Sequence, residues 1–342
     1  MLKYSKPQFI DEYNKMNNEF QDSLIYHVGE NAGLFSELNN MLIAMCWCYI
    51  NKVKFILYAD DANFTGGQGW EELFVPFCEI NHNKLNRYAN YRRKSHFRYK
   101  RIQLPNLIFR RFFLPNLLKK QTGAKYLTQD VFPIITSKQF LNSHIEWNLF
   151  GINGSVEKEF VKLRDLAICY NSNVFQEIKR NISSLNLPAC YYSMQIRGGD
   201  KIQEYSTLYD ATYLCKKVLS IKNDIKDLFL FTDDYRNFSI VKKMMNCNVY
   251  TLAKEYERGY YNTSFNLIPW NNRKSDIIKV LSMMELCIGS KMHFGYTGAC
   301  TNDFLSSVRD ENCYFNMLGT EAIDARRKKN IGFYLHKFFQ FK

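Results

Sequence analysis

The chain has 342 residues, of which 46% are hydrophobic and 23% are charged. This composition is typical of a folded globular protein, and the length suffices for one large core or two ordinary ones. With 7 prolines, 16 glycines and no apparent internal repeat, the sequence excludes a fibrous or low-complexity chain. We expect no signal peptide and no membrane span, because the start is polar and no uncharged apolar run is long enough. The 10 cysteines have no regular spacing, which favours reduced thiols in a cytoplasmic chain.

The formal net charge of +13 is concentrated in one segment. No acidic residue occurs between Glu79 and Asp130, and segment 80–125 interleaves basic with aromatic side chains. Residues 326–342, in the tail, repeat this pattern on a smaller scale. Such surfaces attract anionic lipid, nucleic acid or an anionic substrate, whereas a solvated basic face needs no partner. We expect peripheral attachment to the cytoplasmic face of a membrane and, for want of a recognisable nucleic-acid motif, no nucleic acid partner.

The first half of the chain predicts a strand, a turn with two glycines, a helix and a second strand. Apolar residues 24–28 and 54–58 predict the strands, and residues 34–50 have a strongly helical pattern. This order is the signature of a parallel sheet, in which the first turn lies at the ligand-binding edge. A tight turn without a ligand would have the same pattern. Three turn residues are assigned to the acceptor side of a site: Gly29, Asn31 and Gly33.

The middle of the chain is less regular. Residues 80–125 are predicted to be irregular or helical, and residues 137–184 to be mainly helical, ending before Pro188. We place the boundary between two domains there, so that residues 1–185 form an N-terminal domain on the acceptor side of the site.

The second half repeats the alternation of strand and helix more clearly. Short apolar runs predict strands at 191–196, 228–232, 249–252 and 287–290. Helical patterns follow them at 209–220, 238–245, 275–286 and, after a turn, 295–306. We predict an α/β chain of two Rossmann-type domains facing across a cleft, with the donor domain at 186–320 and a tail at 321–342.

The strand predicted at 191–196 ends in the most informative turn of the sequence. Directly after it come Arg197, Gly198, Gly199, Asp200 and Lys201. Two glycines let a backbone approach a ligand closely, and an arginine at the carboxyl end of a strand suits a phosphate or diphosphate. The adjacent acid and base offer groups for proton transfer. We therefore expect the turn to bind the phosphates of a donor.

The sequence Gln-Ile-Arg-Gly-Gly-Asp-Lys at 195–201 resembles the first motif of the fucosyltransferase superfamily, which is His-x-Arg-x-x-Asp-Lys in the α1,6-fucosyltransferases. Residues 229–234 are similar to that family's strand ending in Thr-Asp-Asp, and residues 275–290 to its helix beginning Asp-Ile. The three segments agree in order and spacing and cover residues 190–310. The resemblance implies a GT-B fold, GDP-fucose as donor, inversion at the sugar carbon and no catalytic metal.

The resemblance also implies catalytic roles. Arg197 would supply positive charge against the leaving diphosphate, and the sequence contains no Asp-x-Asp pair of the kind that holds a metal-bound sugar nucleotide. Glu204, aided by Lys201, would accept the proton of the acceptor hydroxyl, with Asp200 as the alternative base. A structural ion pair of Arg197 and an ordinary surface position of Glu204 are the competing interpretations.

Donor recognition would involve residues from all three segments. Asp276, at the start of a helix, would recognise the nucleotide, unless it merely offsets the helix dipole. Asp234 would hold the nucleotide or stabilise Arg197, and Ser290 lies in the family's serine-containing turn. Gln195 replaces the family's histidine; a glutamine can bond a base edge or a hydroxyl but carries no charge.

Three functions follow from these observations. The first is a fucosyltransferase acting on a glycan or a lipid-linked saccharide, and the second is a transferase that uses another GDP- or UDP-sugar. The third is a non-catalytic nucleic-acid-binding protein that uses residues 84–125. A zinc enzyme is not expected, because the histidines show no ligand spacing with the cysteines.

Overall fold

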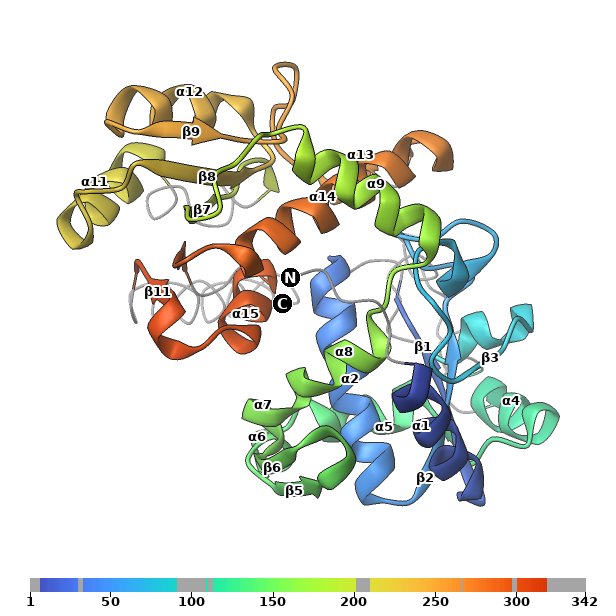
Figure 1. Ribbon diagram of the computed structural model, residues 1–342. Coiled ribbons are helices and arrows are strands. Elements are labelled where there is room, and N and C mark those ends of the chain that lie inside the picture. The colour runs from blue at the N-terminus through green and yellow to red at the C-terminus, as the bar shows by residue number, and fades with distance from the viewer. Residues whose placement is uncertain are drawn as a thin grey trace, which may run out of the picture. The chain divides into compact units, whose positions relative to one another are not determined.

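The computed structural model describes residues 7–29, 33–90, 109, 113–200, 210–265, 267–296 and 300–318 (Figure 1). The chain divides into two compact units. The N-terminal unit holds the described residues up to Gln176 together with Pro269–Ser275, and the C-terminal unit holds Glu177–Ile268 and those from Asp276 onward. Much of the basic segment (91–108 and 110–112) and the tail at 321–342 lie outside the described residues.

The N-terminal unit is built on a parallel sheet with the strand order β3-β2-β1-β4. Its strands are β1 (Asp22–His27), β2 (Val53–Tyr58), β3 (Glu79–Ile80) and β4 (Tyr126–Leu127). β1 and β2 pair along their whole length, from Asp22 opposite Val53 to His27 opposite Tyr58. The helix α2 (Leu34–Ile50) connects them and packs against β2 (Figure 1), so the predicted strand, turn, helix and strand are confirmed.

α2 is deeply buried because its sequence is apolar nearly all round. Its buried side chains include Leu38, Met41, Met45 and Trp47. The helix begins after Gly33, whose backbone is extended, and ends at Ile50. Lys52, with a φ of 53°, then turns the chain into β2.

Short helices and a hairpin complete this unit. The helices are α1 (Pro7–Glu19), η1 (Gly69–Glu72), η2 (Lys84–Tyr88), α4 (Leu114–Thr122), α5 (Thr128–Ile135), α6 (Lys138–Leu141), η5 (Asn148–Phe150), α7 (Val156–Glu159), η6 (Phe160–Leu163), α8 (Arg164–Ala167) and the start of α9 (Ser172–Ser183), whose residues from Glu177 onward belong to the C-terminal unit. The hairpin pairs β5 (His144–Trp147) with β6 (Ile152–Ser155) antiparallel. The prediction that residues 137–184 are mainly helical is therefore wrong at the hairpin. In β5, the buried Ile145 and Trp147 alternate with exposed residues, which is the pattern of a strand.

The C-terminal unit contains a second parallel sheet, ordered β11-β10-β7-β8-β9. Its strands are β7 (Tyr192–Ile196), β8 (Asp227–Thr232), β9 (Asn248–Tyr250), β10 (His293–Gly295) and β11 (Tyr314–Asn316). Its helices are α11 (Ala211–Ile221), α12 (Tyr235–Met244), α13 (Asn262–Phe265), α14 (Trp270–Gly289), whose first turns belong to the N-terminal unit, α15 (Cys300–Val308) and η7 (Glu311–Cys313). The predicted α/β class is confirmed by this alternation.

The two faces of the C-terminal sheet differ in polarity. On one face Met194, Ile196 and Phe294 join a core with apolar side chains of α11 and α12. Successive strand residues point to opposite faces, so Ser193 and Gln195 lie on the other face. There they meet polar side chains that follow α14 and begin α15.

The end of α14 differs from the prediction. Residues 287–290, predicted as a strand, are the last turn of α14 and the residue after it, and the strand begins at His293. Arg309 binds this helix end: its guanidinium donates to the carbonyls of Cys287 (2.5 Å), Ile288 (2.6 Å) and Ser290 (2.7 Å). The helix extends beyond its predicted end at residue 286 because Arg309, distant in the sequence, satisfies its last carbonyls.

Within the described ranges, no helix combines the length and apolarity that crossing a bilayer requires.

Candidate functional site

The strand order of the C-terminal sheet reverses between β7 and β10. From β7 the chain continues to β8 and β9 on one side, then to β10 and β11 on the other. Ligands of open parallel sheets bind at the carboxyl ends of the strands that flank such a reversal. Arg197 directly follows β7 and Tyr296 directly follows β10, and the Arg197 amide donates to the Tyr296 hydroxyl at 2.9 Å. The predicted arginine therefore lies at the switch point.

The guanidinium of Arg197 is held on one side. Its Nε donates to Asp233 Oδ2 at 3.0 Å, its Nη2 lies 3.8 Å from Asp200 Oδ1, and its central carbon lies 5.7 Å from the ring centroid of Tyr260. Burial alone would lower the pKa of this guanidinium. The pKa is nevertheless raised overall, chiefly by the negative charge of Asp233. Among the described residues, neither terminal nitrogen donates a hydrogen bond, and Nη2 meets the carboxylate of Asp200 only at ion-pair distance.

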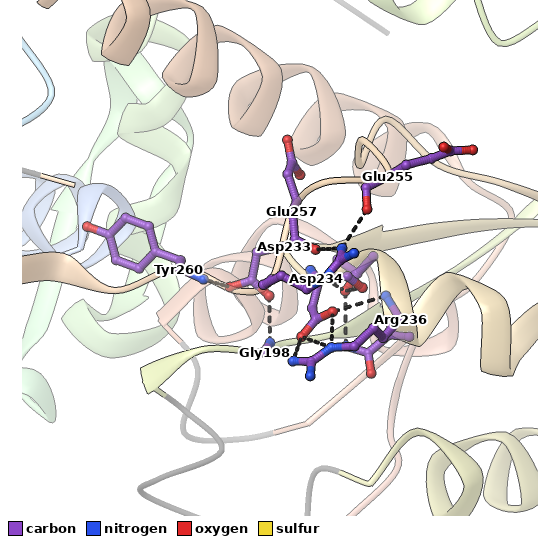
Figure 2. A network of polar contacts seen from close by, with 10 residues as sticks. Gly198, Asp233, Asp234, Arg236, Glu255, Glu257 and Tyr260 are labelled. Carbon is purple, nitrogen blue, oxygen red and sulfur yellow. Dashed lines mark hydrogen bonds and ion pairs between the residues drawn. The ribbon is translucent and has the colours of Figure 1, made fainter. Parts of the chain in front are cut away.

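Asp233 connects the ends of two strands with the loop at 251–261 (Figure 2). Its Oδ1 accepts from the amide of Gly198 at 2.5 Å, and its Oδ2 accepts from Arg197 Nε and from the amide of Tyr260 at 3.1 Å. Its carbonyl accepts from the amide of Gly259 at 2.8 Å. One carboxylate thus fixes the side chain of Arg197 and the path of the turn that carries it.

The two glycines after Arg197 approach protein backbone rather than open space. Gly199 has a φ of +58°, and a Cβ there would lie 2.1 Å from the carbonyl oxygen of Tyr260. Gly259, with a φ of +100°, would place a Cβ 2.2 Å from the Gly199 nitrogen. At Gly198 a Cβ would lie 2.7 Å from Cβ of Asp234. The geometry accounts for the glycines by packing of the turn against the loop, a reason that differs from the predicted approach to a ligand.

Asp234 does not pair with Arg197, contrary to one of its two predicted roles. Its carboxylate is taken by Arg236, whose Nε and Nη2 donate to it at 2.9 and 2.5 Å (Figure 2). It also caps α12 by accepting from the Arg236 amide at 3.0 Å. Burial opposes ionisation, but these hydrogen bonds lower the pKa of Asp234 overall. Asp234 is 2% exposed, and Asp233 makes the contact that was assigned to it.

Gln195 lies under the sheet, beside the first turn of α15. Its Oε1 accepts from the hydroxyl of Thr301 at 2.8 Å, and its side chain is fully buried. Its Nε2 has no hydrogen-bond acceptor among the residues that the structure describes. Gln195, one residue before the end of β7, thus has a buried amide group whose Nε2 donates to no described residue.

Ser290 lies away from this point. It precedes β10, which is parallel to β7, so it lies at the amino edge of the sheet whereas Arg197 lies at the carboxyl edge. Its hydroxyl is buried, donates to the carbonyl of Cys287 at 2.9 Å and lies 2.7 Å from that of Ser193. The structure does not bring Ser290 to the other candidate residues.

His293 belongs to the same buried polar layer. Its Nε2 lies 3.1 Å from Asn302 Oδ1, which accepts, and its Nδ1 lies 2.8 Å from the hydroxyl of Ser193. Nε2 therefore carries the proton, and Ser193 donates to Nδ1. Burial lowers the pKa of the His293 imidazole to about 3, so the ring is neutral near neutral pH.

Asp276 lies inside α14 and not at its start, because the helix begins at Trp270. Its carboxylate is 40% exposed and lies 3.4 Å from Nζ of Lys279. Lys279 also pairs with Glu257 of the loop at 251–261. Lys279 thus links Asp276 to the loop that packs against Gly199. The prediction that Asp276 lies at the start of its helix is wrong.

Of the predicted acid–base residues, the structure describes Asp200. Its amide donates to the Tyr260 carbonyl at 3.0 Å, and its side chain is 32% exposed beside Arg197. Lys201 and Glu204 lie outside the described residues.

In the N-terminal unit, the predicted turn follows β1. The amide of Gly29 donates to Glu37 Oε2 of α2 at 2.9 Å, and Gly33 is the exposed N-cap residue of that helix. Asn31 lies outside the described residues. At the end of β1, the buried His27 contacts Asp61 through its Nε2 at 2.9 Å. The turn is at the expected edge of its sheet, and its first glycine amide is already satisfied.

Sequence reasoning missed Asp233, Tyr260 and Tyr296 as neighbours of Arg197. Asp233 was visible as one of two aspartates that end a strand, and the structure shows that the first of them faces the arginine. Tyr260 follows Gly259, whose left-handed φ marks a turn, but nothing in the sequence pairs that loop with the glycines after β7.

Comparison with known protein structures identifies the fold of this chain. No protein-family model and no curated protein matches the sequence. A structure of the α1,6-fucosyltransferase NodZ soaked with GDP-fucose superposes with a TM-score of 0.51 at 10% identity, covering 84% of this chain and 93% of that one. A fucosyltransferase NodZ structure from Bradyrhizobium gives 0.49 at 10% identity, covering 83% and 91%. POFUT1 in complex with GDP gives 0.44 at 10% identity, covering 86% and 98%. The chain therefore has the GT-B-like fold of the fucosyltransferase NodZ, as the motif resemblance implied.

Proposed function

We propose that this protein is an inverting fucosyltransferase that uses GDP-fucose as donor and a glycan or lipid-linked saccharide as acceptor. The observation that carries the proposal is the guanidinium of Arg197, which Asp233 fixes at the switch point while neither terminal nitrogen donates a hydrogen bond to a described residue. A planar fork of this kind fits the oxygens of a diphosphate. The fold shared with NodZ, in a structure soaked with GDP-fucose, supports this donor.

In the proposed reaction the bond between the sugar carbon and the diphosphate oxygen breaks as the acceptor oxygen bonds to the opposite face of that carbon. Negative charge develops on the departing GDP, and Arg197 stabilises it more strongly in the transition state than in the bound donor. The acceptor hydroxyl gives its proton to a carboxylate. We assign this role to Glu204, aided by Lys201, with Asp200 as the alternative base beside Arg197.

We propose that this charge stabilisation needs no metal. The guanidinium carries a permanent positive charge, because Asp233 and Asp200 raise its pKa overall. Its position where the leaving phosphates would lie lets it do the work that a divalent cation does in other glycosyltransferases. Adding a chelator should therefore leave the rate unchanged.

Gln195 is the reason to test the donor directly. A buried amide with an unused Nε2 donor stands where the resembling enzymes have a histidine, and it would bond an acceptor atom of a ribose, base or phosphate. Another GDP- or UDP-sugar is therefore the second candidate donor.

The first test measures release of the nucleoside diphosphate from a panel of GDP- and UDP-sugars, with transfer products identified by mass. We expect turnover of GDP-fucose, and the change Arg197→Ala should lower it by about a hundredfold or more. The control is Arg180→Ala, which removes an exposed arginine from α9 in the same unit.

Each outcome has a defined meaning. Turnover of another nucleotide sugar alone would replace GDP-fucose by that donor. Equal rates for Arg197→Ala and Arg180→Ala would contradict the assigned site. Absence of any nucleotide-sugar turnover, with steeply salt-dependent binding of RNA or DNA, would favour the nucleic-acid-binding function instead.

A further inference from the structure

The helix α4 is apolar on two faces. Leu114 and Leu118 face inward and pack with the core beneath the sheet. Phe113 and Leu117, also four residues apart, face outward and are 63% and 48% exposed. Residues at this spacing lie side by side on a helix, so the outward pair forms a second apolar stripe.

This stripe extends beyond the helix. Phe109 is 49% exposed, and its ring stacks with that of Phe113 at a centroid distance of 6.3 Å. Leu85, on the neighbouring η2, is 40% exposed. We name Phe109, Phe113 and Leu117 the α4 stripe. Three large apolar side chains in contact with water on one short segment are a feature of interaction surfaces.

Positive charge surrounds the α4 stripe. Lys120 follows Leu117 by three residues and is exposed on the same face of α4, while Lys84 and Arg87 are exposed on η2. Lys119 is neutralised by Asp130 at 2.8 Å. The sequence from 80 to 129 contains no acidic residue, so nothing within this stretch repels an anionic partner.

We propose that the α4 stripe and its flanking cations form a docking surface for an anionic lipid bilayer. Aromatic and leucine side chains gain from burial at the boundary between head groups and acyl chains, and the lysines and arginine attract anionic head groups. A nucleic acid could bind the cations and stack its bases on phenylalanine. Leu85 and Leu117, however, offer neither a charge for phosphates nor an aromatic face for bases. This inference is independent of the catalytic proposal, because no residue of the switch point takes part.

The test is flotation of the full chain with vesicles of phosphatidylcholine alone and of an equal mixture with phosphatidylglycerol. We expect binding to the anionic vesicles at low salt, much weaker binding to the neutral ones, and a steep fall at high salt. Phe113→Asp and Leu117→Asp should each lower the partition coefficient by about tenfold or more. Ile134→Asp is the matched control, since Ile134 is 44% exposed on α5 outside the stripe.

A second measurement does not depend on a charge placed in the helix. Phe113→Trp should show a blue-shifted emission and quenching by brominated phosphatidylcholine in anionic vesicles. Lys120→Glu should weaken binding, whereas Lys120→Arg should preserve it. Binding that Phe113→Asp leaves unchanged would overturn the proposal. So would a dimer in solution that Phe113→Asp dissociates, or binding to RNA without binding to vesicles.

Discussion

Asp233 is the residue that fixes the turn after β7, because its carboxylate accepts from Arg197, Gly198 and Tyr260. Asp233→Asn preserves the shape of the side chain but replaces one acceptor oxygen with a donor. At least one partly buried N–H group loses its acceptor, so the free energy of unfolding should fall by about 1–3 kcal/mol. Because Arg197 also loses the negative charge of its partner, kcat should fall more than KM rises.

Urea unfolding and donor kinetics check this prediction. The control is Asp227→Asn at the amino end of the same strand, where the carboxylate accepts from Asn248 and from the Tyr250 hydroxyl, both at 3.1 Å. If the two variants have equal kcat, Asp233 does not position the arginine.

Gly199 should tolerate no side chain. In Gly199→Ala the new Cβ meets the Tyr260 carbonyl, a backbone atom that cannot rotate away, and the left-handed φ adds strain. Gly123→Ala is a matched control, since Gly123 has a φ of +71° and a Cβ added there would meet no atom within 4 Å. Thermal and urea unfolding should show a loss for Gly199→Ala that exceeds the control by about 2 kcal/mol or more. Equal losses would mean that the contact with the loop is easily relaxed.

At the residue scale, the sequence predicts Arg197 well because an apolar strand that stops at an arginine is a local pattern. It does not predict which of two adjacent aspartates faces that arginine. That choice depends on the register of β7 against β8, with Ile196 opposite Thr232, and on the loop that crosses both strand ends. Ser290 and Asp276 were misplaced because both positions depended on where α14 begins and ends.

The buried polar layer under β7 and β10 makes the stability of the C-terminal unit depend on pH. The pKa of His293 is about 3 in the folded chain, whereas an exposed histidine in the unfolded chain titrates near 6.5. Below about pH 6.5 the unfolded chain therefore binds a proton that the folded chain does not, so stability falls as the pH falls toward 3.

His293→Gln removes this dependence and leaves other titrating groups in place. Between about pH 7.5 and pH 5.5, the wild-type protein should lose about 1.4 kcal/mol more unfolding free energy than the variant. Urea titrations at both pH values measure the two losses. Parallel losses in the two proteins would show that His293 can be protonated in the folded state.

Predictability differs among the elements of this chain. Long patterned segments such as α2 and the strands β1, β2, β7 and β8 were predicted because their apolar spacing is set by local burial. β3 and β4 have two residues each and carry no pattern of their own. The hairpin of β5 and β6 was read as helix, and α14 was cut short because Arg309, which satisfies its last carbonyls, lies far along the chain.

For the whole molecule, the alternation of strand and helix predicted an α/β chain with two sheets. The division between the units was harder to predict. It falls within α9, and the first turns of α14 belong to the N-terminal unit. There Glu72 accepts from Trp270 Nε1 at 3.3 Å and from Lys274 at 3.4 Å. A helix that continues from one unit into another has no break in periodicity, so its sequence contains no boundary signal.

The close contact between Gly199 and Gly259 also limits how this sequence can diverge. A side chain at either position collides with the backbone at or beside the other, so neither glycine can be exchanged on its own while the loop keeps its path. Homologues should therefore retain both glycines, or lose both together with a rebuilt loop. This paired pattern can be searched for in alignments, where it would identify distant relatives that the short motif around Arg197 is too weak to reveal.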